Sequence, residues 1–370
     1  MTSTPRVPAT RTPGSRLRRA LAASAAALLV TVGLAACGTS SADDNAAGGT
    51  AEAPTLRLGY FANVTHALPL IGVQDGTYAK ALGSTTLETQ VFNAGPAAVE
   101  ALFAGAIDAT YIGPNPAINA FVKSNGEAVR IVAGASSGGA QLIVQPDIAS
   151  AADLKGTTVA TPQLGGTQDV ALRYWLKQQG LSAPVQGTGD VTVAPQENAQ
   201  TLDLFKAGKI AGAWVPEPWA SRLVLEGGGK VLVDEKDLWP NGAFVTTHLI
   251  VSTEYLKKYP ATITKLLTAE ADTLDAATKD PAKAKETANA ALNALTGKTL
   301  KPEVLDRAWE NLTLTLDPVA STLQVSADHG VEVGTTQKAD LKGIYDLALL
   351  NALLKSRGGA AVSAAGLGTE

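Results

Sequence analysis

The chain has 370 residues, of which 45% are hydrophobic and 17% charged, and it contains one cysteine. This length allows two domains of ordinary size, and a single cysteine excludes an intrachain disulfide and a cysteine-rich zinc site. The formal charge of −4 argues against a nucleic-acid-binding surface or a polybasic membrane patch.

The first 37 residues have the organisation of an export signal. Five arginines precede an apolar stretch, residues 20–36, that is too short and too rich in alanine for a bilayer-crossing helix. Removing residues 1–36, which hold those five arginines and no acidic residue, changes the formal charge from −4 to −9.

The sequence Leu34-Ala35-Ala36-Cys37 resembles the bacterial lipoprotein signal, in which the cysteine is lipidated and becomes the new N-terminus. We therefore expect residues 1–37 to comprise a signal peptide and a lipidated Cys37, with the mature protein on the outer face of the cell membrane. An ordinary buried cysteine near an export signal is the alternative. The export route stays open, since Arg18-Arg19 matches a twin-arginine signal only in part.

Both ends of the mature chain are predicted to be flexible. Residues 38–54 are mostly Gly, Ala, Ser and Thr, and such a segment buries too little apolar surface to fold. We expect residues 38–54 to form a flexible tether and residues 357–370 a disordered tail.

Short strands alternate with helices from residue 56 to residue 133. Pro96 opens a helix that Gly105 ends, and Pro116 opens another, with Asn115 as its N-cap. One further helix is expected within residues 68–82. The expected strands are 56–60, 87–92, 107–112 and 129–133. This alternation predicts parallel α/β units.

A second α/β set follows residue 139. The expected strands are 142–144, 158–161, 191–193, 210–213 and 231–233, and the expected helices are 167–179, 197–207 and 216–226. Residues 253–355 are expected to be largely helical. The predicted fold class is therefore α/β, with two α/β halves and a helical C-terminal return.

The two halves share a local pattern. Residues 103–107 lead to Gly113-Pro114-Asn115-Pro116, and residues 205–210 lead to Val215-Pro216-Glu217-Pro218. Each is a helix, a glycine stop, a strand and a Pro-x-Pro corner. Unless chance and common turn chemistry explain the match, each half presents a corner at the carboxyl end of a strand, where ligands bind in open α/β sheets.

Motifs for catalysis are scarce. His66, His248 and His329 lie far apart without ligand spacing, and the sequence has neither a Gly-x-Ser-x-Gly elbow nor a phosphate-binding loop. We expect no enzymatic activity, no cofactor and no metal site.

Residues 161–168 have the features of an anion-binding turn. Gly165 and Gly166 let backbone N–H groups converge, and Thr167 and Gln168 add donors at the entrance of the next helix. Together with Gln163, these residues suit an anion without any lysine or arginine. An ordinary glycine-containing turn is the structural alternative.

Other polar and aromatic residues near strand ends are further candidates for ligand contact. They are Asn63, Thr65, His66, Asn115, Ser136, Ser137 and Trp214, and Trp219 and Trp239 can supply apolar walls. Each also has a structural interpretation: a buried histidine, a helix cap, serines in a flexible crossover, or tryptophans in the core.

Glu217 is a special case, because a carboxylate at a helix entrance would repel a bound anion. It either caps its helix or pairs with Arg222, or it recognises the amino group of a zwitterionic ligand such as an aminosulfonate. We favour the structural role and keep Glu217 among the candidates.

Several segments resemble, in order and spacing, the solute-binding lipoproteins of ABC importers in the nitrate/sulfonate/bicarbonate group, of the aliphatic sulfonate and taurine binder type. These segments are 56–67 (LRLGYFANVTHA), 92–96 (FNAGP), 105–109 (GAIDA), 113–117 (GPNPA), 153–156 (DLKG), 159–162 (VATP) and 213–219 (AWVPEPW). The resemblance covers roughly residues 56–256.

The resemblance implies a two-lobed periplasmic-binding-protein-like fold with two crossover segments and the ligand held between the lobes. Residues 55–135 plus 247–356 would form lobe 1, and residues 136–246 would form lobe 2. The first crossover is expected near residues 134–140 and the second near 243–249. The candidate residues from Asn63 to Glu217 would face the cleft.

The resemblance also implies a function. We expect an extracytoplasmic monomer that delivers a small anionic or zwitterionic solute, such as an aliphatic sulfonate, taurine or nitrate, to an ABC permease and its ATPase. One alternative is a binder of a thiamine-precursor-like pyrimidine, with Trp214 or Trp239 stacked on its ring. A second alternative is an enzyme on the same fold that uses His66 or Glu217.

Overall fold

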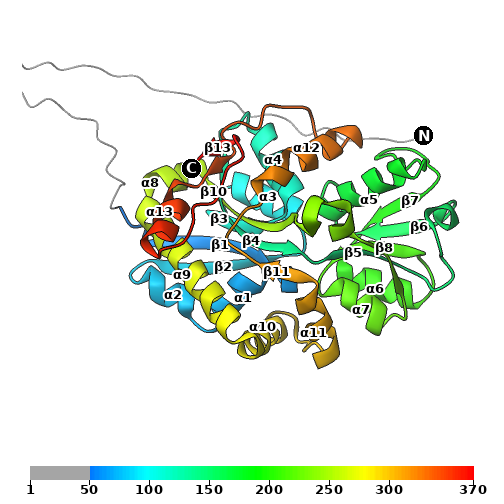
Figure 1. The fold of residues 1–370 in the computed structure, drawn as a ribbon, viewed down its shortest axis with the longest axis horizontal. Helices are drawn as coiled ribbons and strands as arrows, with labels where there is room; N and C mark the ends of the chain where they lie inside the picture. The colour runs from blue at the N-terminus through cyan, green and yellow to red at the C-terminus, as the bar shows by residue number, and fades with distance from the viewer. Residues whose placement is uncertain (1–50) are drawn as a thin grey trace, which may run out of the picture. The chain divides into compact units, whose positions relative to one another are not determined.

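The computed structural model describes residues 51–370. The expected signal peptide, Cys37 and most of the expected tether lie outside the described residues. Residues 51–370 form two β-sheets with helices packed on their faces (Figure 1). None of the helices in this part of the chain combines the length and the apolarity that a bilayer crossing requires.

The larger sheet has eight strands, and β11 (Leu312–Leu314) lies off its main path, paired with β4. The main path runs β13 (Gly368–Thr369), β12 (Tyr345–Asp346), β4 (Val129–Gly138), β10 (Val245–Ser252), β3 (Ala109–Ile112), β1 (Thr55–Phe61) and β2 (Thr86–Phe92). Strand β1 pairs in parallel with β2 and β3, whereas β10 is antiparallel to β3 and β4. The expected parallel units are therefore present, with an antiparallel strand inserted among them.

The smaller sheet has five strands. Their order is β7 (Thr192–Pro195), β6 (Thr158–Thr161), β8 (Gly212–Pro216), β5 (Ala140–Val144) and β9 (Lys230–Asp234). Its two faces bury different residues of β5: Leu142 packs with α5 (Thr167–Gln178), and Ile143 packs with α6 (Asn198–Lys206) and α7 (Trp219–Leu225). Figure 1 shows α5 on one side of this sheet and α6 and α7 on the other.

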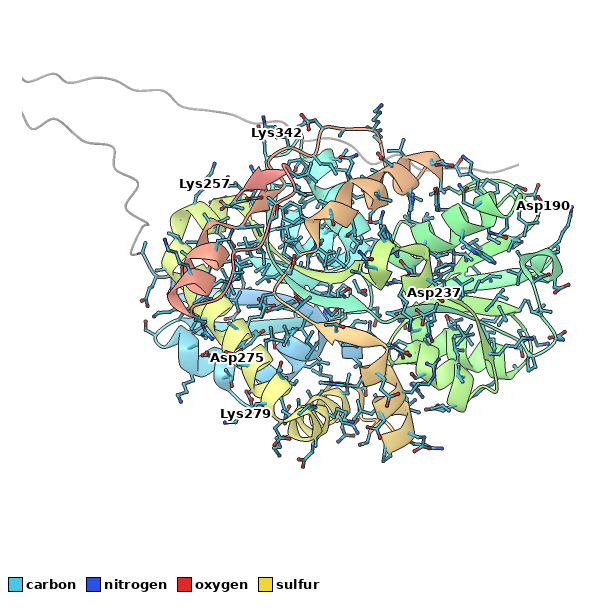
Figure 2. All side chains as sticks on the ribbon, in the orientation of Figure 1. Asp190, Asp237, Lys257, Asp275, Lys279 and Lys342 are labelled. Carbon is cyan, nitrogen blue, oxygen red and sulfur yellow. The ribbon has the colours of Figure 1, made fainter. Side chains whose placement is uncertain are left out.

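Helices cover both faces of the larger sheet and join it into one apolar core. They are α1 (Ala67–Gln74), α2 (Thr77–Leu82), α3 (Gly95–Phe103), α4 (Pro114–Lys123), α8 (Thr253–Lys258), α9 (Pro260–Lys279), α10 (Pro281–Thr296), α11 (Pro302–Glu310), α12 (Leu323–Glu332) and α13 (Ala348–Ser356). Charged side chains such as Lys257, Lys279 and Lys342 project from the outer surface (Figure 2).

The short 3-10 helices connect these elements. They are η1 (Val64–His66), η2 (Ala151–Leu154), η3 (Glu235–Leu238), η4 (Pro240–Gly242) and η5 (Ala320–Thr322). The expected single helix within residues 68–82 is two helices, α1 and α2, because Gly76 adopts φ 81°, in the left-handed region where an α-helix cannot continue.

The chain passes between the two sheets twice. Strand β4 continues to Gly138 in the larger sheet, and Gly139 (φ 76°) leads directly into β5 of the smaller sheet. The return runs through η3 and η4, and β10 already pairs with β4 at Val245. The second crossover therefore begins earlier than the expected residues 243–249.

The C-terminal residues are folded, so the expectation of a disordered tail at 357–370 is wrong. Strand β13 pairs with β12, and the side chain of Ala364 is fully buried. A Cβ on Gly368 would lie 2.1 Å from the carbonyl oxygen of Tyr345, so a glycine is needed for this close approach. Only two residues pair in each strand, and so short a pairing leaves little pattern in the sequence.

The last residues of the expected tether are also packed. Ala53 is 3% exposed, and its backbone N–H donates to the Thr262 hydroxyl over 2.8 Å. The expectation that flexibility extends to residue 54 is therefore wrong at this end, because a hydrogen bond from a residue far away in sequence holds Ala53 in place.

Candidate functional site

A small cavity of about 40 Å³ lies between the two lobes, where β-strands end and helices begin. From the segments around the larger sheet come Phe61, Asn63, Thr65, His66, Asn93, Ala94, Gly95, Gly113, Pro116 and Thr246. From the segments around the smaller sheet come Pro162, Gln163, Gly166, Thr167, Gln168, Asn198 and Pro216. This is the carboxyl-edge location at which open α/β sheets bind ligands.

Four helices begin at this cavity: α3, α4, α5 and α6. Their N-cap residues are Ala94, Gly113, Gly166 and Glu197, and in none of them does the cap side chain bond to the helix. The first N–H groups of a helix have no intrahelical partner, and the helix dipole makes that end partly positive. The convergence of these ends therefore creates positive potential without a cationic side chain.

Helix α5 offers a well-formed donor end. Its first turn contains no proline, whereas α3 and α4 both carry one at the start. The glycine turn before α5 is held by Asp169, whose carboxylate accepts from the Gly165 N–H and the Thr161 hydroxyl, each over 3.0 Å. Arg173 pairs with the same carboxylate over 3.0 Å, and both side chains are almost fully buried. The turn is therefore fixed before any ligand arrives.

Two polar atoms at the cavity lack a partner. Thr167 Oγ1 and Asn198 Oδ1 have no hydrogen bond within residues 51–370, although these residues are only 8% and 9% exposed. Buried polar atoms without partners are uncommon, because each costs roughly 1–3 kcal/mol. A polar ligand in the cavity would supply the missing bonds.

No lysine, arginine, aspartate or glutamate side chain is among the residues that line this cavity. Burial lowers the pKa of His66 to about 3, so its imidazole is neutral at pH 7. His66 Nδ1 accepts from the Phe61 N–H over 3.4 Å, which leaves the proton on Nε2 as a donor. The site thus presents neutral donors and helix ends.

Direct contacts join the lobes around the cavity. Asn93 Nδ2 donates to Glu197 Oε1 over 2.7 Å, and Trp219 Nε1 donates to Asn63 Oδ1 over 2.9 Å. Gly113 approaches α5 so closely that a Cβ there would lie 2.3 Å from Thr167 Oγ1. The lobes are therefore in a closed arrangement.

A wider chamber of about 550 Å³ opens beside this cavity. The two share Asn63, Asn93 and Asn198, and the chamber adds Trp219 and Arg222, whose guanidinium lies 4.7 Å from the Trp219 ring centroid. The chamber therefore adjoins the cavity at these three asparagines.

The structure brings together seven of the twelve residues predicted to contact ligand. Those at the cavity are Asn63, Thr65, His66, Gln163, Gly166, Thr167 and Gln168. They come from the two loops, 63–66 and 163–168, that follow β1 and β6. The shared signal, polar residues directly after a strand, predicted that both loops face the cleft, and both line the cavity.

Four of the other five predicted residues lie outside the cavity lining and support neighbouring segments. Asn115 Nδ2 donates to the Ser326 carbonyl over 2.9 Å, so Asn115 is not the cap of α4, which starts one residue earlier. The Ser136 hydroxyl donates to the Thr65 carbonyl over 2.8 Å, and Ser137 pairs with β10 and β11 within the sheet. Trp214 is fully buried, and its Nε1 donates to Glu235 Oε2 over 2.7 Å.

Glu217 has the structural role that we favoured: its Oε2 accepts from the Ser221 N–H over 3.0 Å in the first turn of α7, so it caps this helix, whereas the expected pair with Arg222 is not formed. Its fully buried carboxylate pairs with Arg307 over 3.1 Å and accepts from Asn311 Nδ2 over 2.7 Å. Burial raises the pKa of this carboxyl group, and the hydrogen bonds and Arg307 oppose the rise. Arg222 pairs instead with Glu226 over 3.0 Å. Because Arg307 lies on α11, this pair also links the helical return to lobe 2.

Sequence reasoning missed Asn93, Asn198, Thr246 and the supporting Asp169. Asn93 follows β2, and Asn198 follows β7, so the signal that placed the loop at 63–66 also applies to them. Thr246 lies within β10, and no local pattern separates it from its neighbours.

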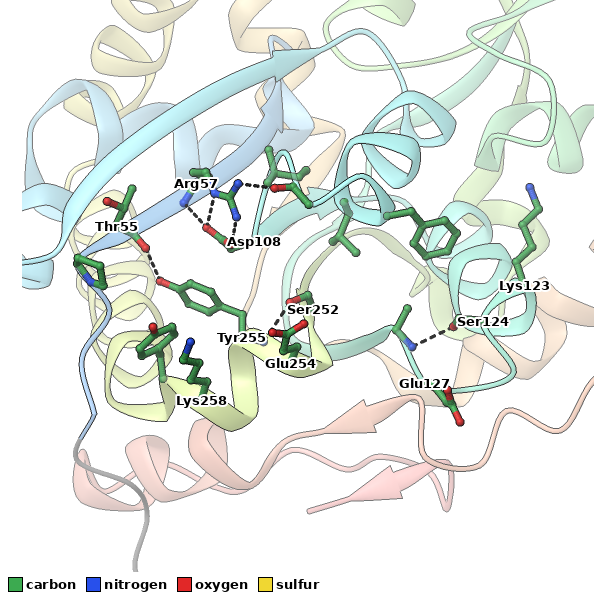
Figure 3. A pocket seen from close by; sticks show the side chains of 17 residues that line it. Thr55, Arg57, Asp108, Lys123, Ser124, Glu127, Ser252, Glu254, Tyr255 and Lys258 are labelled. Atoms are coloured by element: carbon green, nitrogen blue, oxygen red, sulfur yellow. Dashed lines mark hydrogen bonds and ion pairs between the residues drawn. The ribbon is translucent and has the colours of Figure 1, made fainter. Parts of the chain in front are cut away.

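A larger cavity, of about 950 Å³, lies elsewhere, on the lobe of the larger sheet. In Figure 3, Arg57 is bound to Asp108, and Tyr255 donates to the Thr55 carbonyl over 2.8 Å. The Arg57 guanidinium is therefore already neutralised by Asp108, and acidic residues also line the cavity. The residues of the described chain contain no cluster of three or more potential metal ligands.

Similar proteins share this fold. The alkanesulfonate-binding protein SsuA from Xanthomonas axonopodis pv. citri, bound to MOPS, has a TM-score of 0.65 and 23% identity, over 78% of this chain and 96% of that one. The nitrate-binding protein NrtA from Synechocystis PCC 6803 has a TM-score of 0.64 and 20% identity, over 78% and 83% of the two chains. The expected two-lobed α/β fold is therefore confirmed.

Sequence relatives are also binding proteins. The taurine-binding periplasmic protein of Escherichia coli K12 is 27% identical over 190 residues, which cover 51% of this chain and 56% of that protein. The family resemblance drawn from the motifs is thereby confirmed. The NMT1-like family model matches residues 49–292, and the chain belongs to this family.

Proposed function

We propose that this protein is the extracytoplasmic solute-binding component of an ABC importer, and that its cleft holds the oxyanion group of a small solute such as an aliphatic sulfonate, taurine or nitrate. The observation that carries the proposal is the convergence of four helix N-termini on a cavity lined by no charged side chain. Helix ends and neutral donors suit an anion, because they satisfy its oxygens without a counter-charge.

The lining offers several hydrogen-bond donors to an oxyanion. Thr167 Oγ1 has no partner, and the first N–H groups of α5 are uncapped, so an oxyanion would find several donors at one helix end. Asn198 adds an amide, whose nitrogen donates once its side chain is turned toward the ligand. A hydrogen bond to a charged group contributes about 1.5–3 kcal/mol, so a few of them hold a small anion.

The relatives support a transport role. The similar proteins of known ligand bind alkanesulfonates, taurine or nitrate, and a nitrate import ATP-binding protein of Synechocystis is 29% identical over 166 residues, or 23% of its own length. A binding protein of this kind releases its solute to a permease driven by an ATPase. Lobe closure over the solute creates the surface that the permease recognises.

Anchoring by a lipid on Cys37 belongs to the same proposal. Leu34-Ala35-Ala36-Cys37 supports it, as does the single cysteine, which has no partner for a disulfide. The lipid would hold the protein at the outer face of the membrane beside its permease. Mass spectrometry of the membrane fraction, before and after Cys37→Ser, tests this part: the wild-type mass should include a diacylglyceryl group, and the variant should appear unlipidated in the medium.

Binding of a heterocycle against Trp214 has no support from the geometry, because that ring is fully buried and bonded to Glu235. An enzyme that uses Glu217 is also disfavoured, since this carboxylate is committed to Arg307 and Asn311.

Isothermal titration calorimetry with ethanesulfonate, taurine, nitrate and bicarbonate tests the proposal, with ethylammonium as a cationic control. At least one anion should bind, and at about 100 times its Kd it should add roughly 2.7 kcal/mol to the free energy of unfolding. Binding of the cation alone, or of none of these solutes, would contradict an oxyanion site.

A further inference from the structure

A separate cavity of about 640 Å³ lies beside the C-terminal half of α5, whereas the cleft cavity lies at the N-terminal end of this helix. Its walls come from three segments: the C-terminal half of α5, residues 235–243 of the second crossover, and residues 319–329 around α12. It shares no lining residue with the cleft cavity. The volume falls in the range of small-molecule sites, roughly 300–1,000 Å³.

Aromatic rings make up much of the wall. Tyr174 and His329 stack with centroids 3.5 Å apart at 15°, and Trp239 lies 5.9 Å from the His329 ring. Trp239 is itself supported by Phe244, which stacks on it with centroids 5.8 Å apart at 12°. A flat ring can therefore lie against a fixed aromatic surface.

The cavity is open and apolar at its rim. Leu238 is 50% exposed and Val325 is 41% exposed, and both line the cavity. Exposed large apolar side chains beside a concave surface are typical of sites that are covered when a ligand binds.

The charged side chain among the residues that line this cavity is acidic. Glu235 is 2% exposed and lines the cavity, whereas no lysine, arginine or aspartate does so. Its Oε2 accepts from Trp214 Nε1, and none of the ion pairs formed within residues 51–370 includes Glu235. A buried carboxyl group next to aromatic faces attracts cations by both charge and the ring quadrupoles.

The pKa of Glu235 reflects its burial beside this cavity. Burial raises its pKa to about 7, and neighbouring Asp234 adds to the rise, while hydrogen bonds from Trp214 and Trp239 oppose it. Across the cavity, burial lowers the pKa of His329, so that ring is neutral at pH 7 and does not compensate the carboxylate.

We propose that this cavity is a second ligand site, specific for a planar aromatic cation that lies against Trp239 and His329 and donates an N–H to Glu235. The occupant differs in charge from the anion of the cleft, and its binding does not require that the cleft holds an anion.

The site is coupled to the cleft through α5. This helix presents Thr167 and Gln168 to the cleft and Tyr174 and Trp175 to the second cavity. The cavity is completed by α12, and Lys177 of α5 pairs with Glu332 of α12 over 3.0 Å. A ligand that contacts both helices therefore favours the arrangement in which the cleft is closed, and each ligand should strengthen the binding of the other.

The test uses 9-aminoacridine as a planar cation and acridine-9-carboxylate as its anionic counterpart with the same ring system. Fluorescence anisotropy of the full mature chain should show the cation binding at least about 10-fold more tightly than the anion. Glu235→Gln keeps the shape of the side chain and should weaken the cation at least about 10-fold, and Trp239→Ala should do the same. Glu254→Gln and Trp309→Phe, which change the same residue types outside this cavity, should leave binding unchanged.

Separate measurements test whether each variant folds and whether its cleft still binds the anion. Each variant is titrated by calorimetry with the best-bound anion of the cleft panel, and Trp239→Phe retains an aromatic wall if Trp239→Ala does not fold. Saturation with that anion should tighten the binding of 9-aminoacridine several-fold. No binding by the wild-type chain, equal binding of the two acridines, unchanged binding by a folded Glu235→Gln, or displacement of the cation by the cleft anion would each overturn the proposal. A failure of the whole anion panel would leave the acridine comparison intact, so the two proposals fail separately.

Discussion

Replacement of Thr167 by valine separates ligand binding from stability. Thr167 Oγ1 has no partner within the described chain and lines the cleft cavity. Loss of one hydrogen bond to a charged ligand costs about 1.5–3 kcal/mol, which corresponds to a loss of affinity of about 10- to 150-fold. The free energy of unfolding of the ligand-free protein should not fall, because the hydroxyl has no internal bond to lose.

Calorimetry with the tightest-binding anion and urea denaturation measure these two quantities. Thr167→Ser keeps the hydroxyl and should bind within a few-fold of the wild type. Thr273→Val is the matched control: its hydroxyl is 2% exposed and donates to the Ala269 carbonyl over 2.8 Å within α9, so anion affinity should not change. Wild-type affinity in Thr167→Val would refute the reasoning, since an unpartnered donor at the site would then do nothing for the ligand.

Three further predictions follow from the same structure. Gly113→Ala should reduce anion affinity, measured by calorimetry, about 10-fold or more. The reason is that the added Cβ would lie 2.3 Å from Thr167 Oγ1 and hold the lobes apart. Unchanged affinity would show that the close approach is not needed. Sulfonate affinity should not change from pH 6 to pH 8, because the pKa of His66 is about 3 and no other residue that lines the cavity titrates in this range. A decline in affinity centred near pH 6.5 would mean that His66 binds as a cation. Burial raises the pKa of Glu235 from an ordinary value of 4.5 to about 7, so the folded protein keeps this proton over a pH range in which the unfolded chain loses it. Wild-type stability should therefore fall by about 3 kcal/mol relative to Glu235→Gln as the pH of urea denaturation rises from 4.5 to 8, and parallel curves would contradict this.

The elements that repeat locally were predictable. Alternating apolar runs and glycine or proline boundaries identified most strands and helices of both halves, because these signals act within a few residues. The loop 163–168 was predicted to face the cleft for the same reason: glycines, a hydroxyl and a helix entrance lie together in sequence, and the structure places them at the cavity. That it binds an anion stays a prediction.

Side chains whose partners are distant in sequence were not predictable. Asn115 precedes a proline and looks like a helix cap, yet it bonds to Ser326, which lies 211 residues away. Glu217 finds Arg307 rather than Arg222, because α11 packs against lobe 2 and a guanidinium five residues along the chain does not reach the buried side of α7. The pairing of Gly368 with Tyr345 likewise joins distant parts of the chain, and strands of two residues leave no recognisable pattern in the sequence.

The sequence by itself determined the α/β class, the family and the two loops that line the cleft cavity, because backbone conformation and helix polarity are set by neighbouring residues. Only the tertiary structure decided which polar groups remain without a partner. Folding buries Thr167 and Asn198 at the cavity, each with a polar atom that has no hydrogen-bond partner within residues 51–370. The same folding brings Glu235 and Trp239 together with His329 beside α5. Whether a polar group is satisfied depends on everything packed around it, and that is a property of the fold as a whole.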